Sequence, residues 1–135
     1  VPGFKVPMGT ENLNPWIRMD GHAMFRFATG GFASIIQDVV AKSGWGLSDV
    51  SRVVPHQANS RIIKAAAQKC GVPFERFYIN IDRYGNTTAA AVPIALSEAV
   101  GEKRIRHGDL VMLVSFGSGF TWAGALLRWL DFAES

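Results

Sequence analysis

The sequence has very little cysteine and no large excess of charge of either sign. A single cysteine, Cys70, excludes a disulfide within the chain, and so few thiols favour an intracellular protein. Fourteen Lys and Arg against eleven Asp and Glu give a formal net charge of +3. This mild excess argues against a nucleic-acid-binding protein unless the charges cluster, but it suits a small acidic partner.

Long apolar runs, internal repeats and low-complexity segments are also missing. No apolar run is long enough to cross a bilayer, and no basic-then-apolar signal segment opens the sequence. We therefore expect a cytoplasmic protein that contacts neither a membrane nor nucleic acid. With 48% hydrophobic and 19% charged residues in 135, the composition is that of one small globular domain with a core of its own.

The first residues have no hydrophobic periodicity. Residues 1–16 hold three of the six prolines, two glycines and two asparagines, a composition typical of a loop. So long a structureless opening suggests that its partner surface, or a preceding strand, lies outside this chain. We expect residues 1–18 to lead in from a preceding segment and residues 19–135 to form the domain.

A helix and a strand are predicted next. Residues 24–40 carry apolar side chains at helical spacing. The pair Gly30 and Gly31 lies in this helix, and such a pair is tolerated where another backbone approaches closely. A strand at 50–55 follows, and Asn59 is a suitable N-cap for a second helix.

The remaining sequence predicts a strand, a helix and a hairpin through the core. In order, these are a strand at 77–81, a helix from Thr88 to the basic cluster 103–108, a strand at 110–114 buried on both faces, and a strand at 120–129. Pro93 predicts a kink or a tight start of the helix, with Ile94, Leu96 and Val100 facing inward. This order calls for a mixed sheet with helices packed on it.

Two polar positions are candidates for chemistry. His56 follows the strand at 50–55 and precedes the helix start at Asn59, so it lies where open α/β sheets bind ligands. Asn86 lies in a polar turn before a helix of small residues. Each has a structural alternative: His56 could simply end a strand and bond a neighbour, and Asn86 could form an ordinary Asx turn. The basic cluster 103–108 likewise fits a solvated turn.

Three motifs together resemble one enzyme family. They are Val54-Pro55-His56-Gln57-Ala58-Asn59, Tyr84-Gly85-Asn86-Thr87 and Phe116-Gly117-Ser118-Gly119-Phe120-Thr121-Trp122. In this order they resemble the C-terminal half of β-ketoacyl-ACP synthase III, over about residues 19–129. The resemblance implies an α/β, thiolase-like fold in which a mixed sheet is packed with helices.

The resemblance also implies a reaction. His56 and Asn86 resemble the family's catalytic histidine and asparagine, and the backbone N–H of Ser118 lies where the family has an oxyanion-hole donor. The family transfers an acyl group from coenzyme A to a cysteine and condenses it with malonyl-ACP, with loss of carbon dioxide, to begin fatty-acid chains. It uses acyl-CoA as a substrate and no further cofactor or metal.

Partner-binding residues follow from the same resemblance. The docking positions for the acidic acyl carrier protein are Arg61, Arg26 and Lys69, and the positions that line the pantetheine tunnel are Gly21, Phe25, Ala58 and Asn59. Gln68 replaces one family lysine and Lys64 adds a charge, while exposed basic residues also occur simply as solubilising groups. A homodimer is expected.

The family's nucleophile has no counterpart in this sequence. Cys70 falls on the inward face of a helix, where a thiol acts as a small hydrophobic group with a raised pKa. One hypothesis is a catalytic C-terminal part whose thiol-bearing half lies on another segment; another is an isolated, non-catalytic domain that binds acyl carrier protein or coenzyme A. A third is a relative that primes polyketide or other secondary-metabolite synthesis.

Overall fold

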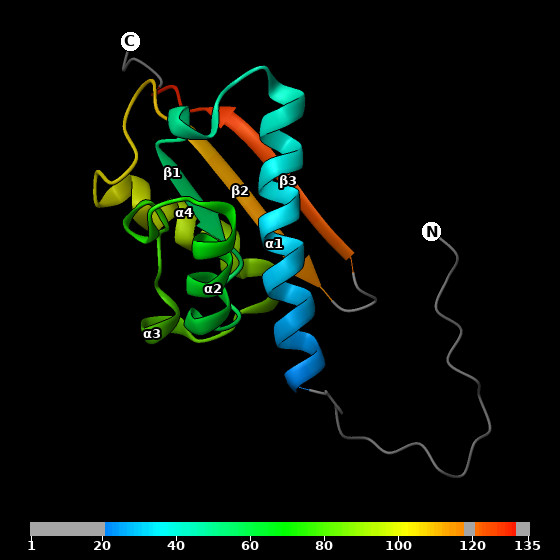
Figure 1. Cartoon of the computed structure of the whole chain (residues 1–135). Helices are drawn as coiled ribbons and strands as arrows, with labels where there is room; N and C mark the ends of the chain where they lie inside the picture. Colours follow the sequence, from blue (N-terminus) through cyan, green and yellow to red (C-terminus); the bar gives the residue numbers. More distant parts are fainter. Residues whose placement is uncertain (1–20, 118–120, 132–135) are drawn as a thin grey trace, which may run out of the picture.

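The computed structural model describes residues 21–117 and 121–131 (Figure 1). The α-helices and strands are α1 (Gly21–Ser43), β1 (Arg52–Pro55), α2 (Ser60–Cys70), α3 (Ile81–Tyr84), α4 (Ala91–Gly101), β2 (Leu110–Gly117) and β3 (Thr121–Arg128). Three 3₁₀ turns lie between them, at Leu47–Asp49, Phe74–Arg76 and Thr88–Ala90. The expected lead-in at residues 1–18 lies outside the described residues and stays a prediction.

The strands form one mixed sheet in the order β1-β2-β3. β1 pairs in parallel with β2, and β2 pairs antiparallel with β3. In the parallel pair Pro55 lies opposite Val114, so both strands deliver their next residues to the same edge of the sheet. His56 and the end of β2 therefore meet there, as the sequence predicts for a site at the carboxyl ends of strands.

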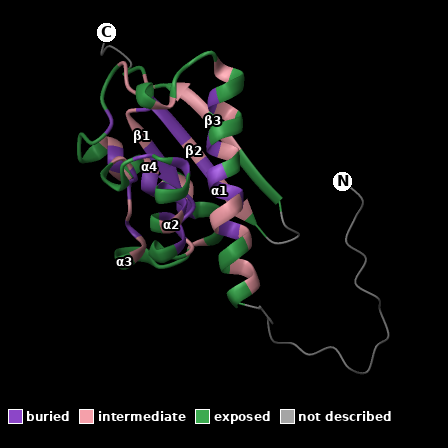
Figure 2. Ribbon diagram, viewed as in Figure 1, coloured by how far each residue is buried: buried purple, intermediate pink, exposed green. Residues whose placement is uncertain are grey.

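Helices cover both faces of the sheet (Figures 1 and 2). α1 and α2 lie together on one face, over a core that includes Phe32, Ile63 and Met112. α4 covers the other face, where Val54 and Val111 contribute to a second, smaller cluster. β2 is the central strand and is mostly buried, which confirms the prediction of a strand covered on both sides.

α1 packs closely on β3 because glycine lies at the crossing point. A Cβ atom on Gly124 would lie 2.9 Å from Cγ1 of Ile35 and 3.0 Å from Cγ2 of Val39, which is closer than side chains pack. Gly31 faces the ring of Trp122 in the same way, at 3.2 Å. The expected close approach at the Gly-Gly pair is therefore made by side chains, those of Trp122 and Lys69, and the prediction of an approaching backbone is wrong.

Other predictions for the second half also need correction. The segment 77–81 forms a single bridge between Phe77 and Val53 rather than a strand. β3 lies at the edge of the described sheet with many exposed residues, so only the β2 half of the hairpin runs through the core. On α4 the fully buried positions are Ala91, Ala95 and Ala99. Leu96 and Val100 are partly buried against the second cluster, as predicted, whereas Ile94 is partly buried outside it.

The start of α4 confirms one of the two forms expected at Pro93. Pro93 is the third residue of α4, and the 3₁₀ turn Thr88–Ala90 precedes it. A proline in the first turn removes no intrahelical hydrogen bond, so the helix starts tightly without a kink. In the described residues no helix is long and apolar enough to cross a membrane.

Candidate functional site

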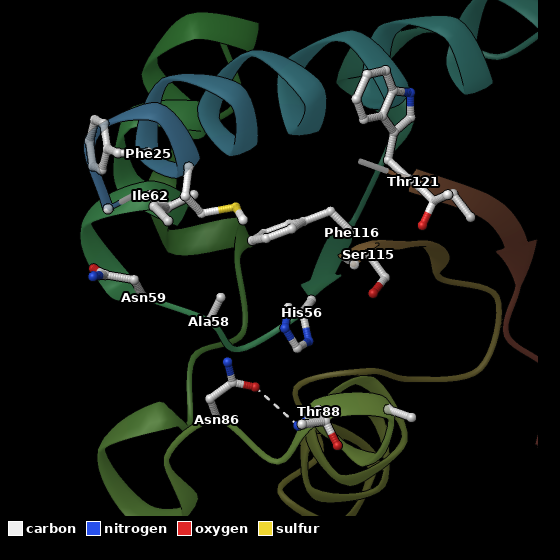
Figure 3. A pocket seen from close by; sticks show the side chains of 16 residues that line it. Phe25, His56, Ala58, Asn59, Ile62, Asn86, Thr88, Ser115, Phe116 and Thr121 are labelled. Carbon is white, nitrogen blue, oxygen red and sulfur yellow. Dashed lines mark hydrogen bonds between the residues drawn. The ribbon is translucent and has the colours of Figure 1, made fainter. Parts of the chain in front are cut away.

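A cavity of about 800 Å³ opens at the edge of the sheet where β1 and β2 end (Figure 3). Its walls come from the start of α1, the β1–α2 connection, the turn before α4, and the β2–β3 hairpin. The lining residues are Gly21, Met24, Phe25, His56, Ala58, Asn59, Ile62, Asn86, Thr88, Ala89, Ser115, Phe116, Gly117, Thr121, Trp122 and Ala123. Four separate segments therefore converge on one largely apolar space that holds a few polar groups, as is usual for small-molecule sites.

His56 is held at this cavity by a backbone hydrogen bond and by packing on an aromatic ring. Its N–H donates to the carbonyl of Val114 at 2.8 Å, which continues the β1–β2 pairing by one residue. The ring meets Phe116 edge-on, with centroids 5.3 Å apart, and 7% of the residue is exposed. Burial lowers the pKa of His56 below 6.5, so the ring is neutral at pH 7.

The Nδ1 atom of His56 has no hydrogen-bond partner among the described residues. Buried polar atoms are nearly always paired, and an exception in a native protein is typical of a functional position. Nδ1 itself is shielded from solvent, so a ligand in the cavity would meet another part of the ring, and the two observations together favour a functional position for His56. The alternative of a histidine that merely bonds a neighbour loses support.

Asn86 lines the same cavity from the turn before α4. Its Oδ1 accepts a hydrogen bond from the backbone N–H of Thr88 at 3.0 Å, so the amide nitrogen is the end that this bond leaves unused (Figure 3). Thr88 has a positive φ of 53°, which is uncommon for a residue with a Cβ atom. The Asx turn that the sequence allows as an alternative is present, and Asn86 forms it while lining the cavity.

The four predicted pantetheine positions all line the cavity. Gly21 and Phe25 lie on the first turns of α1, and Ala58 and Asn59 lie just before α2. Asn59 is also the N-cap, since its Oδ1 accepts from the N–H of Arg61 at 2.8 Å. What these residues bind stays a prediction.

The sequence did not single out several other lining residues. Thr88, Ser115 and Trp122 lie in or beside the quoted motifs, but no local pattern sets them apart. Only the folded structure identifies them, because each lies at the end of a strand or turn that reaches the same sheet edge as His56. Ser118, the predicted oxyanion-hole donor, lies outside the described residues, although its neighbour Gly117 lines the cavity.

The predicted docking residues lie outside the cavity lining, on the two packed helices beside it. Arg26 on α1 and both Arg61 and Lys69 on α2 are exposed. Lys64 and Gln68 are exposed on α2 as well. The structure thus leaves these side chains accessible, and their partner stays a prediction.

Cys70 is unsuited to be a nucleophile where it lies. It is 5% exposed, its Sγ donates to the carbonyl of Ala67, and burial raises the pKa of the thiol. It is also absent from the cavity lining. Among the described residues no group of three His, Cys, Asp or Glu side chains is arranged to hold a metal ion.

Comparison with known proteins places this chain in a family. Residues 40–129 match the family model described as 3-oxoacyl-[acyl-carrier-protein (ACP)] synthase III C terminal. β-Ketoacyl-[acyl-carrier-protein] synthase III of Roseiflexus castenholzii is 45% identical over 130 residues, which cover 94% of this chain and 39% of that protein. The chain thus spans about two fifths of the length of the curated relatives it matches.

Solved structures give the same result. The chain superposes on β-ketoacyl-[acyl-carrier-protein] synthase III from Thermus thermophilus with a TM-score of 0.84 and 45% identity, over 96% of this chain and 40% of that one. The priming β-ketosynthase of the R1128 polyketide pathway gives a TM-score of 0.76 and 33% identity, over 84% and 34% of the two chains. These likenesses confirm the predicted α/β, thiolase-like fold. The chain belongs to the 3-oxoacyl-[acyl-carrier-protein] synthase III family and carries its C-terminal domain.

Proposed function

We propose that this chain is the C-terminal catalytic part of a 3-oxoacyl-ACP synthase III. The enzyme condenses an acyl group from acyl-CoA with malonyl-ACP, releases carbon dioxide and begins a fatty-acid chain. The observation that carries the proposal is that His56 and Asn86, the two residues matched to the family's catalytic pair, line one cavity although they are 30 positions apart.

The geometry suits the decarboxylation step. Loss of carbon dioxide from a malonyl thioester leaves an enolate whose charge develops on the thioester oxygen. In the proposed mechanism the neutral ring of His56 and the amide nitrogen of Asn86 donate hydrogen bonds to that oxygen. Each donor of this kind contributes about 3–4 kcal/mol to the transition state, and an apolar wall such as the half-buried Phe116 strengthens the interaction by limiting contact with water.

The nucleophile comes from outside this chain in the proposal. Cys70 is buried away from the cavity, and the curated relatives are much longer than this chain. We propose that a thiol-bearing N-terminal half completes the site, that the complete enzyme is a homodimer, and that it needs no cofactor beyond acyl-CoA as substrate.

The proposed carrier-protein surface is formed by Arg61, Arg26 and Lys69. An acyl carrier protein is acidic, and exposed basic side chains near the cavity would steer it. Arg61→Glu in the complete enzyme should raise the KM for malonyl-ACP about 10-fold, since a charge reversal turns attraction into repulsion, and should leave acylation by acyl-CoA nearly unchanged. An unchanged KM for malonyl-ACP would remove Arg61 from the docking surface.

The test of the overall function starts with the complete protein that contains this chain. Incubation with acyl-CoA and malonyl-ACP should release free coenzyme A, carbon dioxide and a 3-oxoacyl-ACP in equal amounts. The intact mass of the polypeptides in the same sample identifies whether the thiol-bearing half is on this chain or on another one. Coenzyme A or carrier-protein binding without condensation by an otherwise complete protein would instead favour a non-catalytic binding domain.

A priming function in polyketide synthesis is the second candidate. It is supported by the likeness to the R1128 priming ketosynthase, at 33% identity. The proposed positions of His56 and Asn86 serve the same chemistry in both cases, so the two differ in acyl group and carrier protein. A competition assay separates the two functions. It offers the complete enzyme malonyl groups on a carrier protein of fatty-acid synthesis and on one of polyketide synthesis, and measures which of the two is condensed faster.

A further inference from the structure

Glu98, on the helix that follows the Asn86 turn, collects an unusual number of hydrogen bonds. Its Oε1 accepts from the hydroxyl of Tyr84 at 2.6 Å, and its Oε2 accepts from Nδ2 of Asn80 at 2.8 Å and from Nη2 of Arg83 at 2.7 Å. These three donors, Tyr84 first, hold the pKa of Glu98 at about 2. The carboxylate is therefore ionised and fully engaged at neutral pH.

These donors lie at the two ends of the short helix that leads into Asn86, and the hydroxyl of Tyr78 is a weaker fourth donor to Oε2 at 3.5 Å. Asn80 is the residue before α3, and Arg83 and Tyr84 are its last two residues. A helix of four residues has too few hydrogen bonds to be stable alone. Glu98 thus fixes both ends of α3 against α4. The turn that contains Asn86 connects these two helices.

A buried glutamine continues this network to His56. Gln57 is 1% exposed, and its Nε2 donates to the carbonyls of Pro55 at 2.9 Å and Tyr78 at 3.1 Å. Its Oε1 accepts from the backbone N–H of Asn80 at 3.0 Å. One glutamine side chain therefore joins the segment that carries His56 to the residue that bonds Glu98.

We propose that Glu98, Asn80 and Gln57 are positioning residues that set the place of Asn86 relative to His56. The proposal rests on the proposed function, because it assigns the network to that reaction. Neither Glu98 nor Asn80 lines the cavity, so they act through the backbone of α3 and its neighbours. α4 itself is anchored on the sheet by Ala91, Ala95 and Ala99 and does not need the carboxylate for its packing.

The structure offers a matched control for Glu98. Glu102 is the C-cap residue that follows α4, and its Oε1 accepts a hydrogen bond from Nη2 of the same Arg83 at 3.5 Å. It has no hydrogen bond with Asn80 or Tyr84 in the described structure. Glu98→Gln and Glu102→Gln remove the same charge at neighbouring places, but only the first weakens the bonds at both ends of α3.

The experiment measures both half-reactions of the complete enzyme. Glu98→Gln should lower kcat for malonyl decarboxylation about 10- to 100-fold, the size expected when a reacting group is slightly misplaced, with KM and thiol acylation nearly unchanged. Tyr84→Phe, which removes one bond at an exposed residue, should show a smaller loss of the same kind even if Glu98→Gln folds poorly. Glu102→Gln should match the wild type.

Several results would overturn the proposal. A positioning role of the Glu98 network is excluded if Glu98→Gln and Tyr84→Phe both keep the wild-type kcat. It is also excluded if they slow acylation and decarboxylation equally. If the wild-type enzyme does not decarboxylate malonyl-ACP, the proposed function fails. The side-chain amide NMR signals of Asn86 then decide the positioning alone: they shift in Tyr84→Phe but not in Glu102→Gln if the network holds the turn, and stay in place in both if it does not.

Discussion

The two candidate catalytic side chains of the cavity are held in place by different means. His56 continues a strand pairing, packs on an aromatic ring and is almost completely buried. Asn86 lies on an exposed turn, and the bonds of Glu98 to Asn80 and Tyr84 fix the segment before it. The place of His56 therefore follows from the core, whereas the place of Asn86 depends on a few polar groups.

The largest effect on the free energy of unfolding should come from removing the aromatic ring that packs against His56. Phe116 meets Phe32 edge-on at 5.0 Å and His56 at 5.3 Å, so Phe116→Ala takes packing from the core and from the site. We expect a loss of about 2–3 kcal/mol in the free energy of unfolding, below the range for a fully buried ring because Phe116 is half-buried.

Urea unfolding measures this loss, with Phe74→Ala as the control. Phe74 is 38% exposed and is not among the cavity-lining residues. A loss at Phe116 no larger than that at Phe74 would contradict the view that the core positions His56.

The next effect tests the crossing of α1 over β3. Gly124→Ala adds a methyl group where Ile35 and Val39 leave no room, and overpacking of this kind costs about 1–3 kcal/mol. Gly101→Ala is the matched control, since nothing lies within 4 Å of the added atom. Thermal unfolding should show a lower Tm for Gly124→Ala alone, and equal Tm values would refute the close contact.

The pH dependence of stability should separate the two regions. The pKa of His56 is lowered from 6.5 in the folded chain, so the unfolded chain binds its proton more readily and stability falls as the pH falls below 6.5. The pKa of Glu98 is lowered from 4.5 to about 2, so its contribution is present above 4.5 and is lost as the pH falls toward 2.

Unfolding curves over this pH range test both assignments. Glu98→Gln should lose the stability change below pH 4.5 and keep the one below 6.5, whereas Glu102→Gln should keep both. A wild-type profile that is flat below pH 4.5 would show that the Glu98 bonds do not form in solution.

The smallest effect concerns the strained turn. Thr88 and Lys103 have positive φ values of 53° and 57°, and glycine adopts this conformation without the cost of a Cβ atom. Lys103→Gly and Thr88→Gly should each raise the free energy of unfolding by up to about 1 kcal/mol. Denaturant unfolding measures both variants. If Lys103→Gly raises the free energy of unfolding and Thr88→Gly lowers it, the threonine side chain itself supports the Asn86 turn.

Local patterns in the sequence predicted the parts of the fold that local physics determines. Helical spacing located α1, and Asn59 caps α2 as predicted. The apolar run at 110–114 became the buried central strand β2. His56 and Asn86 were identified because the motifs that contain them resemble a known family, and the structure brings both to one cavity.

The errors arose where distant residues decide the structure. The segment 77–81 contains residues typical of strands, but beyond Tyr78 its backbone does not continue a ladder, because the N–H of Asn80 bonds the side chain of Gln57. The space at Gly31 is filled by Trp122, which is 91 positions away. Glu98 was not predicted at all, since a glutamate on a helix surface has no local pattern that reveals its partners.

The most direct test is the ratio of the two half-reaction rates in His56→Ala and Asn86→Ala of the complete enzyme. We expect each substitution to slow malonyl decarboxylation by about 10²–10³-fold, the cost of one lost oxyanion donor, while acylation of the thiol by acyl-CoA changes far less. Near-normal decarboxylation in either variant would contradict the account, because the two side chains would then share a cavity without sharing the reaction.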